Sequence, residues 1–365
     1  MDSRNGNAEA ESMKKYQFVR KIRIGNKMVG AHAPVLIIAE AGVNHNGDIN
    51  IAMRLIDEAA KAGVDVVKFQ SFKPDALILK DVEKAPYQKG TTGIQENQYE
   101  MLQRLQMPIE KMKILKEYCE DKGMIFLSTP FDEESLEELD KIGVTAYKVA
   151  STDTTNLHFL RQVALKGKPI FLSTGMCNQL EVDRAVDEIY SYNKQLFLMQ
   201  CTANYPVKDS EINLSVLNEY KTRYQCIIGF SDHSEGVGAA PYAVPLGAKV
   251  IEKHFTLDKS MNGPDHKASL NPSELRELVK MIRKVETYMG DEKGKHLTLS
   301  EIETRKSLQK NIVAGRDIKE GEIYSEENIV CKRTGGVGIR AENFYKLIGK
   351  KADRSYKKND IIQKD

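Results

Sequence analysis

Apolar and polar positions alternate along the chain in a unit that repeats from Val35 onward. Each unit contains a short apolar run rich in β-branched residues, a polar or glycine-containing turn, and a segment with helical periodicity. Near-continuous apolar strands that alternate with helices are typical of a parallel sheet covered on both faces. The eight runs begin at Val35, Val64, Met124, Ala146, Pro169, Leu196, Ile227 and Lys249.

The segments between these runs carry the pattern of amphipathic helices. In residues 49–63 the apolar side chains recur on one helical face, with Asp48 as the predicted N-cap and Gly63 as the predicted stop. Eight strands alternating with helices over about 250 residues predict a (β/α)8 TIM barrel, which we place at residues 35–290. A doubly wound open sheet is the alternative, but its GxGxxG turn is missing.

The sequence on either side of the barrel predicts three further parts. Residues 1–34 begin polar and end in QFVRKIRIGNKMVG, a predicted hairpin that would close the bottom of the barrel. Residues 291–305 are dense in charge and are interpreted as a linker. Residues 306–365 contain short β runs separated by the turns KEGE, TGG and KKND, which predicts a compact β-rich domain.

Charge and composition exclude several classes of protein. The chain has 54 basic and 52 acidic side chains, a net charge of +2, so no overall field favours nucleic acid or a membrane surface. We find no apolar stretch of the roughly 20 residues that span a bilayer and no apolar signal-peptide core, so we expect a cytoplasmic protein. The five cysteines are scattered without a CxxC pair, which predicts reduced thiols rather than disulfides or a zinc site.

Polar side chains end nearly every apolar run, where the loops of a barrel converge on one mouth. A single serine or threonine there is ordinarily a helix cap, but the whole set predicts one polar cavity. The set comprises Glu40, Lys68, Gln70, Ser128, Thr129, Lys148, Ser151, Ser173, Thr202, Ser231, His233, Glu252 and His254.

Three charged residues within this set indicate anion binding and acid/base chemistry. Lys68 and Lys148 lie in apolar runs, where an ammonium group needs an anionic partner, and the nearby hydroxyls make a phosphate site the natural interpretation. Glu40, in VLIIAEAG, is our candidate for acid/base chemistry because a buried acid is costly without a partner or a role. For Asn44 and His45, two interpretations are equally supported: a turn that starts the next helix, or a contact with the substrate.

Two histidines at the ends of adjacent predicted strands suggest a metal site. Neighbouring strands are about 4.8 Å apart, so His233 and His254 are within reach of one divalent cation. Glu252 would point into the same cavity and bind the metal directly or through water. Such a site keeps open coordination positions, as a Lewis acid requires.

Ordered motifs along most of the chain resemble the sialic acid (N-acetylneuraminate) synthase family. The resemblance runs from about Phe18 to the end, and the tail, with NIVAGRDIKEGE and CKRTGGVGI, is similar to that family's antifreeze-like (SAF) domain. The other motifs are IIAEAGVNHNGD, VVKFQSF, GMIFLSTPFD, YKVAS, GKPIFLSTGM, CTANYPV, IGFSDHS, GAKVIEKHFTLD and GPDHKASLNPSEL.

The resemblance implies a synthase that condenses phosphoenolpyruvate with an N-acylated hexosamine, N-acetylmannosamine in the first instance, and releases phosphate. It implies a domain-swapped homodimer in which Arg333 reaches the neighbouring barrel, and a manganese or magnesium ion on His233 and His254 with Glu252 nearby. The implied phosphoenolpyruvate contacts are Lys68, Thr129, Lys148, Ser151, Ser173 and Ser231. The implied sugar contacts are Glu40, Gln70, Tyr205, Asp265 and Arg333.

The departures from the family pattern fall on the acceptor side. Asp153 follows Ser151 where many members have glutamate, Thr334 replaces a proline beside Arg333, and Ala203 replaces an asparagine, which turns attention to Asn204. We therefore add Asp153 and Asn204 to the sugar contacts. For Glu40 we expect a role as base or as stabiliser of positive charge.

Three alternatives stay open at this level. A sister synthase would use a diacetamido-hexose and make legionaminic or pseudaminic acid. A class-I aldolase would form a Schiff base, for which Lys148 is placed, and borohydride trapping with pyruvate would detect it. A SAF-type ligand-binding protein without catalysis would release no phosphate with any aldehyde.

Overall fold

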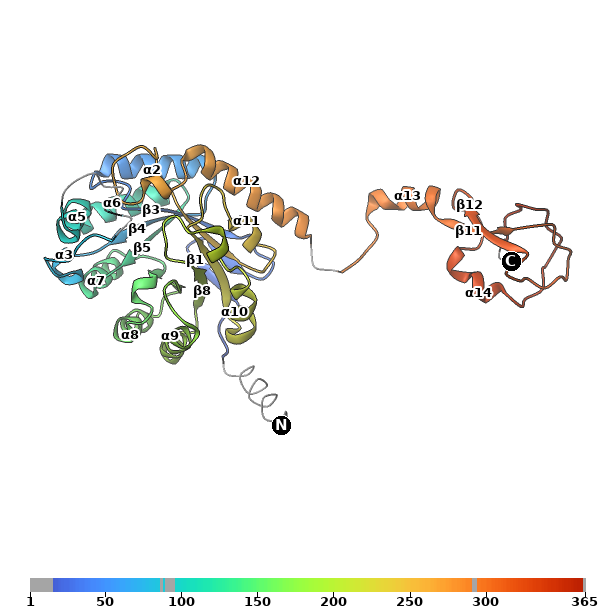
Figure 1. Cartoon of the computed structure of the whole chain (residues 1–365), viewed down its shortest axis with the longest axis horizontal. Helices are drawn as coiled ribbons and strands as arrows, with labels where there is room; N and C mark the ends of the chain where they lie inside the picture. Colours follow the sequence, from blue (N-terminus) through green and yellow to red (C-terminus); the bar gives the residue numbers. More distant parts are fainter. Residues whose placement is uncertain (1–15, 86–87, 89–95, 291–293, 364–365) are drawn as a thin grey trace. The chain divides into compact units, whose positions relative to one another are not determined.

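The structure is a computed structural model that describes residues 16–85, 88, 96–290 and 294–363 (Figure 1). The chain divides into two compact units, Met1–Gly290 and Asp291–Asp365. Each unit is described by itself below. Within the described residues, no helix combines the length and apolarity needed to cross a bilayer.

The first unit is built on eight parallel strands, one at each of the eight predicted runs. The hydrogen-bonded order is β5-β4-β3-β10-β9-β8-β7-β6, and β5 also contacts β6, so the sheet returns on itself. This arrangement confirms the predicted TIM barrel. The strands are β3 (Leu36–Gly42), β4 (Val66–Ser71), β5 (Ile125–Pro130), β6 (Tyr147–Val149), β7 (Ile170–Ser173), β8 (Leu196–Cys201), β9 (Ile227–Asp232) and β10 (Val250–His254).

Helices surround these strands, as Figure 1 shows. Helix α2 (Ile49–Ala62) begins as predicted, since the Asp48 side chain accepts a hydrogen bond from the Asn50 N–H, and it ends at Gly63, whose φ is +79°. The other helices of this unit are α3 (Pro74–Leu77), α5 (Gln98–Leu105), α6 (Ile109–Asp121), α7 (Glu133–Lys141), α8 (Leu157–Leu165), α9 (Gln179–Tyr192), α10 (Val216–Tyr224), α11 (Ala240–Ala243) and α12 (Pro272–Met289), with 3-10 turns η1 (Ser151–Asp153), η2 (Asp209–Glu211) and η3 (His266–Ala268).

A hairpin closes one end of the barrel. Strands β1 (Lys21–Ile24) and β2 (Lys27–Gly30) pair antiparallel about Gly25 and Asn26, as the sequence predicts. Ile22 and Ile24 are buried in one apolar cluster with Leu36 and Val66, which lie at the N-terminal ends of β3 and β4. Because the hairpin fills this end, the opposite mouth remains for binding and chemistry.

The second unit starts with a helix where the sequence suggested only a linker. Helix α13 (Leu299–Leu308) begins at Thr298, whose side chain caps the Glu301 N–H while Glu301 returns to the Thr298 backbone. This capping box was overlooked because the segment is rich in charge. Strands β11 (Lys310–Ala314) and β12 (Ile329–Arg333) then pair antiparallel, followed by η4 (Ala341–Asn343) and α14 (Phe344–Leu347). The predicted β-rich domain is therefore present.

Candidate active site

Strand register brings the predicted polar side chains to one level of the barrel. Glu40 on β3 lies opposite Lys68 on β4 and opposite His254 on β10. A bulge follows Glu40, and Gly42 there has a φ of +52°, where a Cβ would be crowded at 3.3 Å from both Gln70 Nε2 and Glu40 Oε1. The bulge thus lets the Glu40 and Gln70 side chains approach each other.

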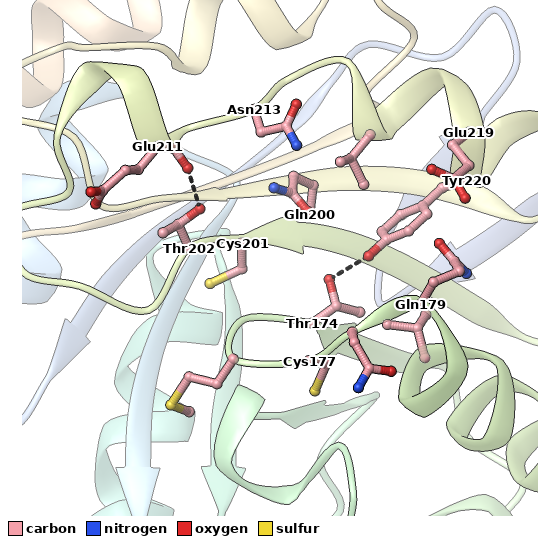
Figure 2. Close-up of a pocket in the computed structure, with 14 residues that line it drawn as sticks. Thr174, Cys177, Gln179, Gln200, Cys201, Thr202, Glu211, Asn213, Glu219 and Tyr220 are labelled. Atoms are coloured by element: carbon pink, nitrogen blue, oxygen red, sulfur yellow. Dashed lines mark hydrogen bonds between the residues drawn. The ribbon is translucent and has the colours of Figure 1, made fainter.

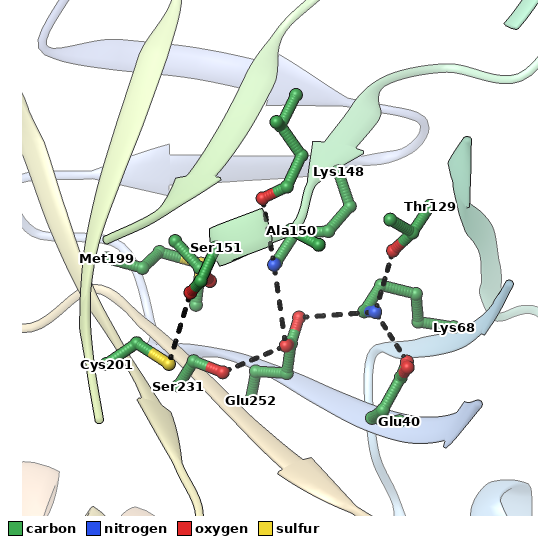
Figure 3. A network of polar contacts seen from close by, with 12 residues as sticks. Glu40, Lys68, Thr129, Lys148, Ala150, Ser151, Met199, Cys201, Ser231 and Glu252 are labelled. Carbon is green, nitrogen blue, oxygen red and sulfur yellow. Dashed lines mark hydrogen bonds and ion pairs between the residues drawn. The ribbon is translucent and has the colours of Figure 1, made fainter. Parts of the chain in front are cut away.

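Two buried lysines form the centre of the site with two carboxylates (Figure 3). Lys68 Nζ lies 2.7 Å from Glu40 Oε2, 3.0 Å from Thr129 Oγ1 and 3.9 Å from Glu252 Oε2. Lys148 Nζ lies 3.8 Å from Glu252 Oε1. The carboxylates therefore balance the two ammonium groups that the sequence left without a counter-charge.

The predicted serines lie around this charged group. Ser231 Oγ donates to Glu252 Oε1 at 3.0 Å. Ser151 Oγ accepts from the Gly175 N–H at 2.9 Å, and Ser173 Oγ is buried and has no hydrogen-bond partner among the described residues. Hydroxyl donors beside two lysines are the combination that holds a phosphate or a carboxylate.

Burial changes the acid–base behaviour of these groups. It raises the pKa of Glu40 to about 7, although Lys68 opposes the shift. Burial also works to raise the pKa of Glu252, but Lys148 and Lys68 outweigh it and the net pKa is lowered. Burial lowers the pKa of Lys148. Near neutral pH, Glu252 is therefore ionised, whereas Glu40 can gain or lose a proton.

The two imidazoles of the predicted metal site lie close together, with ring centroids 5.4 Å apart. His233 Nδ1 donates to the Thr202 carbonyl at 2.8 Å, because a carbonyl oxygen only accepts, and its Nε2 therefore keeps a lone pair. Burial holds the pKa of His254 well below its usual value, and its buried Nδ1 has no hydrogen-bond partner among the described residues. In their neutral forms, two imidazoles this close together suit a divalent cation.

The surroundings of His233 act on its protonation. Burial works to lower the pKa of this imidazole, but the Cys201 thiol and the Thr202 carbonyl outweigh it and the net pKa is raised. Among the described residues no group of three or more histidine, cysteine, aspartate or glutamate side chains is arranged to hold a metal. Glu252, predicted near the metal, accepts from Ser231 and lies beside the two lysines, and its charge also acts on His233.

Two predicted sugar contacts lie against these groups. The Tyr205 ring is centred 4.1 Å from that of His233 and 5.5 Å from that of His254. Gln70 Nε2 donates to Glu40 Oε1 at 3.1 Å. Tyr205 therefore contacts both imidazoles, and Gln70 contacts the acid.

The other predicted sugar contacts are Asp265, Asp153, Asn204 and Arg333. Asp265 is buried, and burial raises its pKa to about 6, with His233 opposing the shift. Asp153 bonds to Thr152 and Asn156 in the turn after β6. Asn204 is exposed, and Arg333 is exposed on β12 of the second unit.

A cavity of about 290 Å³ lies beside this site, between the ends of β7 and β8 and helices α9 and α10 (Figure 2). Tyr220 donates to Thr174 Oγ1 at 2.9 Å and Thr202 donates to the Glu211 carbonyl at 2.9 Å in its wall. Of the polar residues predicted at the strand ends, Thr202 lines it, whereas the residues predicted to contact phosphate, sugar or metal do not. It borders the site through Cys201 and Thr202.

Cys201 was overlooked as a site residue. Its Sγ lies 3.6 Å from Ser151 Oγ and 3.7 Å from His233 Nδ1, so it joins the phosphate side of the site to the imidazole side. The available signal was its place at the end of β8, two residues after Met199, on the face that points into the barrel.

Comparisons with known proteins show which family the chain is similar to. The NeuB family model matches residues 55–294, and the SAF domain model matches residues 311–365. The N,N'-diacetyllegionaminic acid synthases of Campylobacter jejuni and Legionella pneumophila are 44% and 40% identical, over 90% of this chain and 98% and 93% of theirs. A crystal structure of N-acetylneuraminic acid (sialic acid) synthetase from Leptospira borgpetersenii, in complex with citrate, is 34% identical with a TM-score of 0.71, over 80% of this chain and 98% of that one.

Proposed function

The chain belongs to the NeuB family, which confirms the resemblance found in its motifs, and we propose that it is a phosphoenolpyruvate-dependent nonulosonate synthase. The reaction joins C3 of phosphoenolpyruvate to the aldehyde carbon of an N-acylated sugar. Water adds at C2 and phosphate leaves by cleavage of its C–O bond. The observation that supports this most is the buried cluster of Lys68, Lys148 and hydroxyls next to two imidazoles.

For the acceptor we propose a 2,4-diacetamido-6-deoxy-hexose, with N,N'-diacetyllegionaminic acid as the product. Two relatives at 44% and 40% identity bear that product in their names, whereas the sialic acid synthetase structure is 34% identical. The comparisons therefore favour the alternative over N-acetylmannosamine, the acceptor first expected from the motifs. The motif departures at Asp153 and Ala203, both on the acceptor side, agree with a changed sugar.

The lysines and hydroxyls would hold the anionic substrate. Phosphoenolpyruvate carries a phosphate and a carboxylate, and both Lys68 and Lys148 already face carboxylates in the structure. The unpaired Ser173 hydroxyl adds a donor that needs no rearrangement before it binds an oxygen.

His233 and His254 would hold a divalent cation, manganese or magnesium, which when bound supplies Lewis-acid polarisation of the aldehyde oxygen. Glu40 lies on the neighbouring strand and its pKa is raised to about 7. Near neutral pH it can accept the proton of the water that adds at C2. Gln70 donates to Glu40 and fixes the orientation of the carboxyl group.

We also propose that the active protein is a homodimer in which Arg333 serves the partner's barrel. The support is the family resemblance of the tail and the match of residues 311–365 to the SAF domain model.

The experiment that tests the function measures phosphate release from phosphoenolpyruvate with N-acetylmannosamine or with 2,4-diacetamido-6-deoxy-mannose in the presence of Mn²⁺. We expect the diacetamido sugar to give the larger kcat/KM and a nine-carbon 2-keto acid by mass spectrometry. A larger kcat/KM with N-acetylmannosamine would overturn the acceptor but keep the reaction. No release with any aldehyde would overturn the synthase.

A further inference from the structure

Two charged residues lie next to the paired imidazoles but face the other way. Asp232 precedes His233 at the end of β9, and Lys253 precedes His254 at the end of β10. Because successive side chains of a strand point to opposite faces, the histidines turn into the barrel while Asp232 and Lys253 turn toward the helices. The Ala240 N–H of α11 donates to Asp232 Oδ2 at 3.0 Å, which agrees with this outward direction.

Asp232 and Lys253 form a fully buried ion pair across the two strands. Lys253 Nζ lies 2.8 Å from Asp232 Oδ2, and their side chains are 2% and 0% exposed. The two residues are also direct partners in the β9–β10 ladder. A buried ion pair adds little net stability compared with packed apolar residues, whereas fixing a register is a better documented role.

The same pair fixes the chain that follows His233. Asp232 Oδ1 accepts from the Ser234 N–H at 2.8 Å and from Ser234 Oγ at 2.6 Å, and Lys253 Nζ donates to the Ser234 carbonyl at 2.8 Å. The loop folds back tightly, because a Cβ on Gly238 would lie 1.8 Å from Ser234 Oγ. Both chain neighbours of His233 are therefore held by one ion pair.

We propose that Asp232 and Lys253 are positioning residues that set the separation of the His233 and His254 imidazoles, and with it the affinity for a divalent cation. This inference rests on the metal role given to the imidazoles in the proposed function. Metal–ligand distances tolerate changes of only about 0.2 Å, so a small shift of β9 against β10 weakens binding. The ion pair opposes that shift at the level of the two histidines.

The test measures equilibrium binding of Mn²⁺ alone, without substrates, by the electron paramagnetic resonance signal of the free ion. The variant Asp232→Leu/Lys253→Met removes both charges, so neither is left uncompensated in the barrel wall. We expect its apparent Kd for Mn²⁺ to rise about 10- to 100-fold. Its far-UV circular dichroism and urea midpoint should stay near those of the wild type.

The variant Asp140→Leu/Lys168→Met is the control for removing an ion pair elsewhere in the barrel, one that is partly exposed. It removes an ion pair of 2.6 Å that lies near the N-terminal end of β7, away from the imidazoles, and its Mn²⁺ affinity should equal that of the wild type. Should the Asp232/Lys253 variant fail to fold, Ser234→Ala takes its place in the test: a loss of Mn²⁺ affinity of about 10-fold supports the positioning role, and wild-type affinity overturns it.

Wild-type affinity in a folded Asp232/Lys253 variant would overturn the positioning role and leave the proposed function standing. An equal loss in the Asp140/Lys168 control would overturn it as well, since the effect would then be unspecific. If the wild type itself binds no Mn²⁺, both the metal role of the imidazoles and this inference fail.

Discussion

Glu40 combines burial with a close ammonium partner, and this combination decides how it behaves. Burial raises its pKa to about 7 while Lys68, at 2.7 Å, keeps the ionised form accessible. Sequence patterning could identify an acid within an apolar run, but the register of β3 and β4 supplies the partner. Lys148 illustrates the same division, since its counter-charge is Glu252 on a strand about 100 residues away along the chain.

The first prediction concerns this acid. Glu40→Gln keeps the size of the side chain but cannot accept the proton of the attacking water, so we expect kcat to fall about 100-fold or more. The measurement is the initial rate of phosphate release at saturating substrates, with circular dichroism to verify folding. Near-normal turnover in the folded variant would remove the proton-transfer role.

The second prediction concerns pH and stability. Burial lowers the pKa of His45 to about 4, below the ordinary histidine value of 6.5. In the unfolded chain, His45 therefore binds a proton below about pH 6.5, whereas folded His45 stays neutral until about pH 4. The free energy of unfolding therefore decreases as the pH is lowered through that window. We expect the wild type to lose about 2 kcal/mol more than His45→Gln between pH 7 and pH 5.

Urea unfolding of both proteins at the two pH values checks this prediction. Glu40 and Asp265 have raised pKa values and act in the opposite direction, since their protonation favours the folded state as the pH falls. These contributions are common to both proteins and cancel in the difference. Equal losses in the two proteins would show that His45 does not titrate as described.

At the scale of elements, the hairpin of β1 and β2 contributes to stability at the end of the barrel opposite the residues proposed for chemistry. Its apolar side chains fill the N-terminal end of the barrel, while every predicted phosphate and metal residue lies at the C-terminal mouth. The hairpin was predictable because a glycine–asparagine turn between short apolar strands has a specific local pattern. Helix α13 was missed because its many charges indicated a linker, and the capping box is a weaker signal than this charge density.

The third prediction follows from this separation. Ile24→Ala opens a cavity under the barrel, and we expect the free energy of unfolding to fall by about 2–5 kcal/mol. Phosphate release at 25 °C should remain close to that of the wild type, since the site is at the other end. Lys21→Ala, on the exposed face of the same strand, is the control and should change stability by less than about 0.5 kcal/mol. A large loss of activity in folded Ile24→Ala would contradict the separation.

At the scale of the whole molecule, the barrel is one part of the proposed enzyme and the SAF domain is the other. The barrel carries the residues proposed to bind phosphate and metal, whereas Arg333 lies on β12 of the second unit. The proposed homodimer gives this exposed arginine a role in the partner's site.

The fourth prediction tests by complementation whether Arg333 acts in the partner's barrel. Arg333→Ala and Glu40→Gln should each be inactive, but when co-expressed they should recover about a quarter of wild-type activity, because half of the dimers are mixed and each has one complete site. The measurement is phosphate release by the purified mixture. If the arginine serves its own barrel, co-expression recovers nothing.

The sequence by itself determined the barrel, the hairpin and the identity of the polar residues at the strand ends, because hydrophobic periodicity and turn chemistry are local properties. It also pointed to the family through ordered motifs. Only the tertiary structure decided which groups meet: Glu252 joins the lysines, Cys201 links Ser151 to His233, and Asp232 pairs with Lys253. Such partnerships depend on strand register, which brings together residues from distant parts of the chain and which no local pattern specifies.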